Sequence, residues 1–476
     1  MSDDITSLGA LDLSAAIHAR QVSCTEVMQA YLARIDRLNP GINALISLKS
    51  PETLLADARQ MDELAARGQW LGWMHGMPQA IKDLAATRDI RTTYGSPLYR
   101  DFQPAEDSII VERVRRAGAI VIGKTNTPEF GLGSQSYNPV HGVTRNAYDP
   151  ALCAGGSSGG AAAALAARLL PVADGSDMGG SLRNPAAYNN VFGFRPSAGR
   201  VPKYPVPEAF IEQLGVEGPM GRSVPDVARL LATQAGPDPR APLSRSDDPA
   251  VFALPLDAPM RGLRVGWLGD LEGYLPFEPG ILELCAQGLK VLADIGCEVQ
   301  ASSLGFAPQR LWEMWLTLRS CVVAGGRWDD YADPARRAQM KPEAVWEVER
   351  GRSASALDVY RASKERTAWH RHLLTLFQRF DILVLPTAQV FPFDADQHWP
   401  RTIAGREMDT YHRWMEVVIG PTLAGAPAIS VPVGFGAAGA PMGMQLIGAP
   451  GADLRVLQVA HAYDQATRWV ERRPAL

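Results

Sequence analysis

The chain has 476 residues, of which 46% are hydrophobic and 21% charged, as is usual for a globular protein. Its formal net charge of −4 gives no reason to expect nucleic acid or an anionic membrane surface as a partner. The five cysteines form no Cys-x-x-Cys pair, and no apolar run is long enough to span a membrane. Because the acidic amino terminus also lacks a signal-peptide pattern, we expect a cytoplasmic protein without a disulfide framework.

The first 70 residues are predicted to form a helical segment that packs on the core. Ser23 and Glu26 have the spacing of a capping box, and the helix that follows should end at Pro40. A second helix should begin at Pro51 and end at Gly68.

Strands and helices alternate from residue 71 onward. Short strands are expected at 77–81, 119–123 and 172–173, with helices at 107–117 and 161–170 between them. Such alternation is typical of a largely parallel sheet whose two faces are covered by helices. The sequence therefore predicts an α/β fold.

The second half of the chain continues the alternation after a surface excursion at 235–261, which is rich in Pro, Asp and Gly. A Trp-rich helical insertion is expected at about 306–380. The other expected elements are strands at 263–268, 382–385, 427–435 and 442–447, and helices at 280–294 and 452–467. We expect residues 71–476 to form a single compact unit.

Serines stand among glycines in two separate stretches. Residues 155–160 read Gly-Gly-Ser-Ser-Gly-Gly, and Ser181 follows Met178, Gly179 and Gly180. Glycine is suited to positive φ and to close approach by a ligand, and each serine precedes an expected helix whose free N–H groups favour negative charge. The pattern indicates a site that attacks a carbonyl group and holds its oxygen with backbone N–H groups.

A serine nucleophile needs a base, and no histidine lies in either glycine-rich stretch. Lys82, at the end of an apolar strand, can serve as that base if burial lowers its pKa. The alternative is a structural ion pair of Lys82 with Asp83 or Asp177. Both interpretations remain open from the spacing alone.

The serines also have structural interpretations. Ser181 can cap a helix, and Ser157 with Ser158 can form a tight turn. A nucleophile elbow is disfavoured because residues 149–153, which contain Asp and Pro, make a poor strand. Zinc-protease, Walker and dinucleotide motifs are absent, so we predict no metal and no cofactor.

The chain closely resembles the amidase signature family. The segments that carry the resemblance are 76–83, 123–130, 144–146, 155–160, 175–185, 193–201 and 423–432. The resemblance covers residues from about 10 to 465 and implies the amidase-signature fold, with a large, mixed, mostly parallel sheet between helices. It also implies a Ser–cis-Ser–Lys triad.

The resemblance assigns a role to each matching residue. Ser181 would be the nucleophile, Ser157 the bridging serine after a cis Gly156–Ser157 bond, and Lys82 the base. The residues with supporting roles would be Met178, Gly179 and Gly180 as oxyanion-hole donors, and Asp177 and Arg183 as an ion pair that fixes the nucleophile turn. Hydrolysis would pass through an acyl-enzyme.

Three functions are compatible with this family. The first is an amidase that acts on a small aryl or aliphatic amide, and the second is the glutaminase (A-type) subunit of a tRNA-dependent amidotransferase. The third is an esterase, a carbamate hydrolase or a non-catalytic binding module; a complete triad disfavours the non-catalytic module. We expect a small-molecule amide as the partner and no nucleic acid or membrane, and a homodimer is the candidate assembly.

The residues expected to contact substrate help to decide between the amidase and the glutaminase subunit. The glutaminase subunit carries an acidic residue shortly before its Leu-Ala-Gly segment, and counting back from Leu423 reaches Met415, with Glu416 next to it. A thioether does not bind the ammonium group of glutamine. The residues expected to contact substrate are Asn126, Gln135, Tyr137, Gly156 and Met415. If Trp312, Trp315, Trp328 or Trp346 line the cleft, they favour an aromatic or aliphatic acyl group.

Overall fold

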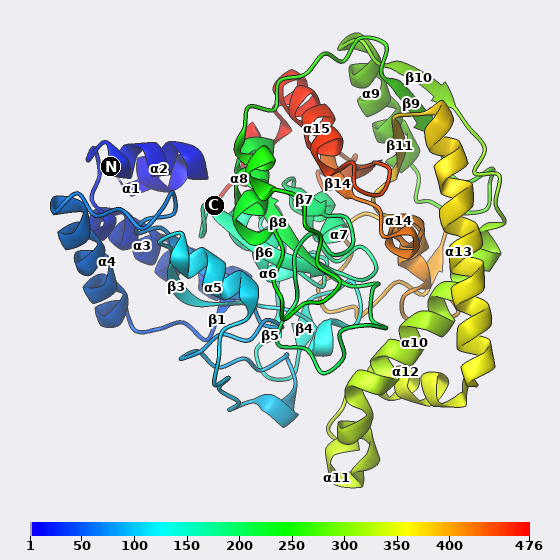
Figure 1. Ribbon diagram of the computed structural model, residues 1–476, viewed down its shortest axis with the longest axis horizontal. Coiled ribbons are helices and arrows are strands. Elements are labelled where there is room, and N and C mark those ends of the chain that lie inside the picture. Colours follow the sequence, from blue (N-terminus) through cyan, green and yellow to red (C-terminus); the bar gives the residue numbers. More distant parts are fainter. Residues whose placement is uncertain (1) are drawn as a thin grey trace.

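The computed structural model describes residues 2–476, and its amino-terminal segment is helical as expected (Figure 1). The helices are α1 (Ser2–Ser7), α2 (Ala10–His18), α3 (Cys24–Ile42) and α4 (Pro51–Ala66). The capping box of Ser23 and Glu26 at the start of α3 is confirmed. The predicted end at Pro40 is wrong, because α3 continues to Ile42 and ends at Asn43, whose left-handed conformation (φ 56°) closes the last turn.

An eight-stranded mixed sheet forms the centre of the molecule, with the strand order β10-β9-β11-β15-β14-β7-β8-β6. Its strands are β6 (Val172–Asp177), β7 (Phe192–Arg195), β8 (Val216–Gly221), β9 (Arg264–Trp267), β10 (Glu298–Ala301), β11 (Ile382–Pro386), β14 (Ala428–Phe435) and β15 (Pro441–Ile447). The mixed sheet is confirmed.

Fewer strand pairs in this sheet are parallel than the sequence predicted. Only β9 pairs in parallel, with β10 and with β11, and the other neighbours in the sheet are antiparallel. Alternation along the chain fixes the order of the elements but not the direction in which each strand joins its neighbours. Here β14 and β15 form a hairpin, and β8 lies antiparallel between β6 and β7.

Smaller sheets lie beside the central one. The strand order β1-β3-β2 joins β1 (Leu45–Ile46), β3 (Ile120–Thr125) and β2 (Pro78–Lys82), with β2 and β3 parallel. Two-stranded ladders join β4 (Tyr137–Asn138) to β5 (Gly142–Val143) and β12 (Thr402–Ile403) to β13 (Arg406–Glu407).

Helices cover both faces of the central sheet, as expected. Gly443 and Met444 are neighbours on β15, so they point to opposite faces. A Cβ on Gly443 would lie 3.0 Å from Ala187 of α7 (Arg183–Tyr188), whereas Met444 contacts Gly288 of α9 (Ile281–Asp294). The α7 and α9 helices therefore lie on opposite sides.

The remaining helices surround this arrangement (Figure 1). They are α5 (Ile109–Arg116), α6 (Gly159–Ala166), α8 (Val224–Gln234), α10 (Pro308–Ala332), α11 (Pro334–Arg337), α12 (Pro342–Ser353), α13 (Ala356–Arg379), α14 (Ile419–Ala424) and α15 (Asp453–Thr467), with 3-10 turns η1 (Pro97–Tyr99), η2 (Glu129–Gly131), η3 (Pro249–Ala253), η4 (Arg413–Val418) and η5 (Trp469–Glu471). The predicted insertion thus consists of α10 to α13, in which α10 packs on α12 and α13.

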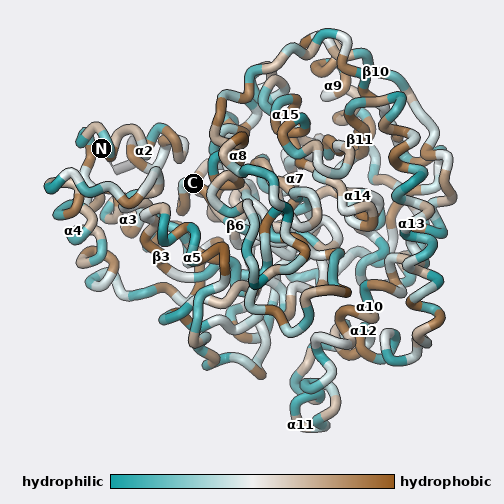
Figure 2. Tube along the Cα trace, viewed as in Figure 1, coloured by the Kyte–Doolittle hydropathy of each residue, from teal (hydrophilic) through white to brown (hydrophobic). Residues whose placement is uncertain are grey.

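The larger of two hydrophobic clusters draws residues from both ends of the chain, from Ala10 to Tyr463. Hydrophilic and hydrophobic stretches alternate along α13, as expected for a helix with one face on the core (Figure 2). The division at residue 70 stays a prediction. Within the described residues, no helix has both the length and the apolar character required to cross a bilayer.

Candidate active site

Lys82 is the last residue of β2, and its side chain is buried among hydroxyl groups. Its Nζ lies 2.8 Å from the Oγ atoms of both Ser157 and Ser158, and 3.0 Å from Ser176 Oγ. Within the described part of the chain it forms no ion pair with Asp83 or Asp177. The alternative of a structural ion pair is therefore wrong, and the amine instead contacts Ser157 and Ser158 of the first glycine-rich stretch and Ser176 of β6.

The environment of Lys82 favours the neutral amine. Burial lowers the pKa of Lys82 to about 7, although the carboxylates of Asp174, Asp177 and Glu217 oppose the shift. A neutral amine has two N–H donors and one lone pair. Three hydroxyl groups around Nζ can therefore satisfy all three positions, with one hydroxyl donating to the lone pair.

The cis peptide bond expected between Gly156 and Ser157 is present. The Ser158 N–H donates to the Ser181 carbonyl oxygen at 3.2 Å, so the loop that carries Ser157 lies directly beside the loop that carries Ser181. Ser157 precedes α6 and Ser181 precedes α7, as expected from the sequence.

An ion pair fixes the turn that carries Ser181. Asp177 accepts hydrogen bonds from the N–H groups of Gly180 (2.9 Å) and Leu182 (3.2 Å), and it pairs with Arg183 (3.0 Å) and Arg195 (3.2 Å). Burial alone would raise the pKa of Asp177, but the two guanidinium groups hold it well below its ordinary value. The predicted Asp177–Arg183 pair is confirmed.

The predicted donors of the oxyanion hole are the N–H groups of Met178, Gly179 and Gly180. The Gly180 N–H is already engaged by Asp177. Within the described residues, the N–H groups of Gly179 and Ser181 have no protein acceptor. An oxyanion hole therefore stays a prediction for this turn, without Gly180 as a free donor.

Ser157 and Ser181 line one cavity of about 190 Å³. Their neighbours in its wall include Ser176, Met178 and Gly179. The other lining residues are Leu84, Phe130, Gly131, Leu132, Gly133, Asp177, Lys203, Gly215, Val216, Glu217, Arg319, Val323 and Met415. The cavity is thus bounded by the serine loops on one side and by apolar and charged side chains on the others.

Comparison with known proteins agrees with this arrangement. The Amidase family model matches residues 26–457. The chain belongs to the Amidase family. The A-type subunit of the glutamyl-tRNA(Gln) amidotransferase from Synechococcus sp. (strain CC9605) is 36% identical over 480 residues, which cover 96% of each chain.

Solved structures of amidases are also similar to this chain. A bacterial aryl acylamidase of the amidase signature family has a TM-score of 0.91 and 28% identity, with coverage of 98% of this chain and 97% of that one. A peptide amidase from Stenotrophomonas maltophilia has a TM-score of 0.82 and 27% identity, with 98% of each chain covered. The protein is therefore an enzyme of the amidase class.

Two tryptophans of the insertion pack at the turn that precedes Ser181. Trp315 Nε1 donates to the Met178 carbonyl oxygen at 3.4 Å, and its ring lies 3.0 Å from the position that a Cβ on Gly179 would occupy. Trp312 stacks on Trp315, whereas Trp328 is exposed. The insertion contributes Arg319 and Val323 of α10 to the lining itself.

Of the residues expected to contact substrate, Met415 lines the cavity. Asn126 and Gln135 are buried and bind backbone carbonyl groups of neighbouring loops. Tyr137 stacks on His398 with 4.1 Å between ring centroids, and Gly156 packs against the backbone of Gln135. These four lie outside the lining, and a substrate role for them stays a prediction.

Sequence reasoning did not identify Lys203, Glu217 or Arg319 as lining residues. They come from the loop before β8, from β8 and from α10, where no motif marks them. The signal for Glu217 is visible only in the strand register, because β8 pairs Glu217 with Ser176 of β6.

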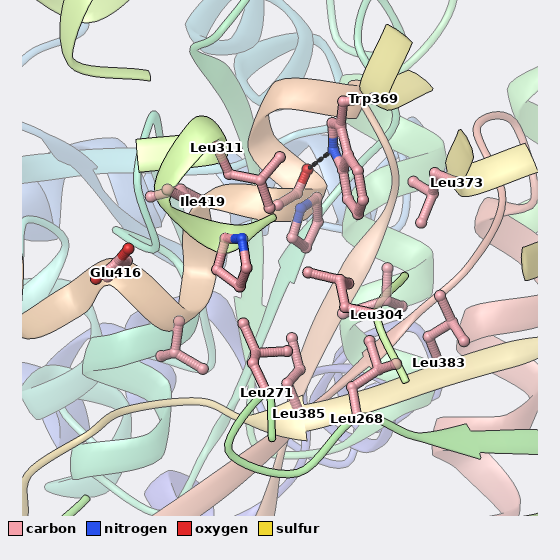
Figure 3. A pocket seen from close by; sticks show the side chains of 15 residues that line it. Leu268, Leu271, Leu304, Leu311, Trp369, Leu373, Leu383, Leu385, Glu416 and Ile419 are labelled. Carbon is pink, nitrogen blue, oxygen red and sulfur yellow. Dashed lines mark hydrogen bonds between the residues drawn. The ribbon is translucent and has the colours of Figure 1, made fainter. Parts of the chain in front are cut away.

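Glu416 turns away from the serines although Met415 faces them. It accepts a hydrogen bond from Tyr274 (2.9 Å) and pairs with Arg413 (3.0 Å), and burial raises its pKa to about 7. It borders a separate hollow of about 30 Å³ that is lined by leucines and Trp369 (Figure 3). That hollow is too small and too apolar to be the amide site.

Proposed function

We propose that this protein hydrolyses small aryl or aliphatic amides with Lys82, Ser157 and Ser181 as its catalytic triad. The observation that carries the proposal is the 2.8 Å contact between Lys82 Nζ and Ser157 Oγ, made by a buried lysine beside the cavity that Ser181 lines. Ser157 lines the same cavity as Ser181, so this contact supports a base-linked hydroxyl beside the proposed nucleophile.

In the proposed reaction, neutral Lys82 accepts a proton from Ser157 while Ser157 accepts one from Ser181. The Ser181 Oγ attacks the amide carbon, and the Gly179 and Ser181 N–H groups face the developing oxyanion. The relay then runs backward and protonates the leaving amine. Water hydrolyses the acyl-enzyme by the same proton path.

Ser158 and Ser176 have a positioning role in this scheme. If both accept the N–H groups of the neutral amine, the lone pair of Lys82 points to the Ser157 hydroxyl. The two serines would thus orient the base without touching the substrate.

The activity should depend on pH through Lys82. The relay requires the neutral amine, so kcat/KM is expected to rise with pH through about 7, the pKa of Lys82. About a tenth of the enzyme should carry the neutral base one unit below that pKa, and about nine tenths one unit above it. A pH–rate profile measured on a neutral anilide checks this. A rate that falls as the pH rises from 6 to 8 would contradict the role of the amine.

Small apolar acyl groups fit the cavity best. Leu84, Phe130, Leu132, Val323 and Met415 supply apolar surface in a volume of about 190 Å³. Two of the charged lining residues already have partners. Lys203 pairs with Glu212 at 2.6 Å, and Arg319 pairs with Glu347 at 2.7 Å.

The glutaminase component of an amidotransferase is the second candidate. The 36% identity to an A-type amidotransferase chain over 96% of both chains favours it. Against it stands Met415 in the cavity wall, with Glu416 turned toward Tyr274 and Arg413. In this arrangement the acidic group adjacent to Met415 does not reach an α-ammonium group in the cavity.

A panel of amides separates the two candidates. We expect kcat/KM for an anilide or an aliphatic amide to exceed that for glutamine by at least about tenfold, because Met415 stands where an acidic side chain would bind the α-ammonium group. Released ammonia or amine is the measurement, and a peptide amide and heat-treated enzyme serve as comparisons. Turnover of glutamine alone would reverse the assignment.

A further inference from the structure

A second, larger cavity lies far from the serines, where the two ends of the chain come together. Its volume is about 510 Å³, and its walls come from α1, α2, the loop after α6, the start of α8, α15 and the carboxyl-terminal tail. Figure 1 shows the chain's carboxyl end between α2 and α8. Nothing in the proposed amidase reaction uses this cavity.

Three arginines in its wall have no acidic partner among the described residues. Arg168 is 7% exposed; its guanidinium makes no hydrogen bond within the described residues, and its Nε is buried without an acceptor. Arg222 donates to the backbone carbonyl groups of Leu170 (2.7 Å) and Leu8. Arg473 donates to Ser7 Oγ at 3.2 Å. Among the described residues, no carboxylate lies within ion-pair distance of these three guanidinium groups.

Three of the four acidic residues of the cavity, Asp226, Asp464 and Glu471, have other partners, and the fourth, Asp12, is exposed in the first turn of α2. Asp226 Oδ1 accepts the Leu11 N–H at 2.9 Å in the first turn of α2, and Asp464 accepts the Val224 N–H at the start of α8. Their charge is therefore directed at helix amino termini. Glu471 pairs with Arg468 at 2.6 Å.

The charged side chains with the largest effect on Arg168 are other arginines. Burial, together with the positive charges of Arg222, Arg473 and Arg34, lowers the pKa of Arg168 to about 10. Burial also raises the pKa of Asp226. A buried guanidinium without a counter-ion is costly, and an anion in the cavity would remove that cost.

We propose that this cavity binds a small oxyanion, a phosphate or carboxylate group, through Arg168, Arg222 and Arg473. The planar fork of a guanidinium matches the paired oxygens of both groups. The volume is in the range of sites for small molecules, so the anionic group can belong to a metabolite of modest size. The ligand ties the amino-terminal helices to the carboxyl-terminal tail.

Isothermal titration calorimetry of the full-length protein with inorganic phosphate and, separately, with succinate tests the proposal. We expect the wild type to bind at least one of them at one site per chain, and Arg168→Gln to weaken that binding by at least about tenfold. The matched control is Arg59→Gln, which removes the same charge from the exposed surface of α4 and should keep the affinity within about twofold. Binding of phosphate alone or of succinate alone identifies the anionic group.

Two results would overturn the proposal: no binding of either anion to the wild type, or equal binding by wild type and Arg168→Gln. Far-UV circular dichroism shows whether Arg168→Gln is folded. If it is not, Arg473→Gln decides, because Arg473 lies on the exposed tail and its replacement leaves the core intact. We expect that variant to bind several-fold more weakly than Arg59→Gln, and equal affinity of the two variants would also overturn the proposal. Neither variant alters a residue of the proposed triad.

Discussion

Replacing Ser181 by alanine is expected to lower kcat for an anilide by about 10⁴- to 10⁶-fold, the range seen when a nucleophile is removed from a serine hydrolase. The proposed reaction has no acyl-enzyme without this oxygen. The fold should survive, because the Ser181 side chain is small and its hydroxyl makes no hydrogen bond to the described residues. Steady-state kinetics together with a thermal melt measure both effects.

Mass spectrometry gives a direct readout of the same prediction. A slowly deacylating aryl ester should add its acyl group to the wild type and leave the Ser181→Ala variant unmodified. Ser355→Ala is the control, because Ser355 caps α13 on the surface and its loss should cost about 1 kcal/mol of stability without changing kcat. A Ser181→Ala variant that retains the wild-type rate or still forms the adduct would remove Ser181 from the reaction.

The position of the site could be predicted because the glycines around its serines are recognisable in the sequence as turn residues. Gly155 (φ 72°) and Gly180 (φ 91°) adopt the left-handed region beside the two serines. Gly160 leaves no room for a side chain, since a Cβ there would lie 2.3 Å from the Asn126 N atom. Lys82 could be identified by its place at the end of an apolar strand, which is where the structure buries it.

The walls of the cavity could not be predicted in the same way. Arg319 faces it from the middle of α10, and Glu217 faces it because β8 pairs with β6. Both placements depend on how distant elements pack, and no local pattern records that. Asn126 and Gln135 show the opposite case: they belong to or adjoin family motifs, yet their side chains hold neighbouring loops in place.

The direction in which each strand pairs with its neighbours could not be predicted from local sequence patterns either. Strand and helix positions follow from periodicity and capping, but a strand's neighbour follows from the path of the chain between them. The hairpin of β14 and β15 and the position of β8 between β6 and β7 make most of the central sheet antiparallel. These antiparallel pairs also bring Ser176 and Glu217 to the same cavity.

Replacing Lys82 by methionine is expected to lower kcat/KM by about 10⁴-fold or more and to abolish the rise in rate near pH 7. Methionine approximates the length of the lysine stem without the amine, so the cavity should keep its shape while the relay loses its base. Kinetics from pH 6 to 9 on the anilide measure both effects, and circular dichroism confirms the fold. A profile that still rises through about 7 in this variant would assign the titration to another group.

The Lys82→Arg variant tests whether residue 82 acts as a base or only supplies a positive charge. Arginine keeps the charge but stays protonated across the accessible pH range, so it cannot accept the proton of Ser157. We expect Lys82→Arg to be as inactive as Lys82→Met, provided that its melting temperature shows a folded protein. An arginine variant with a substantial share of the wild-type rate would mean that a positive charge near Ser157 is sufficient. Lys82 Nζ contacts three hydroxyl groups and no carboxylate in the described structure, an arrangement compatible with the neutral amine that the relay requires.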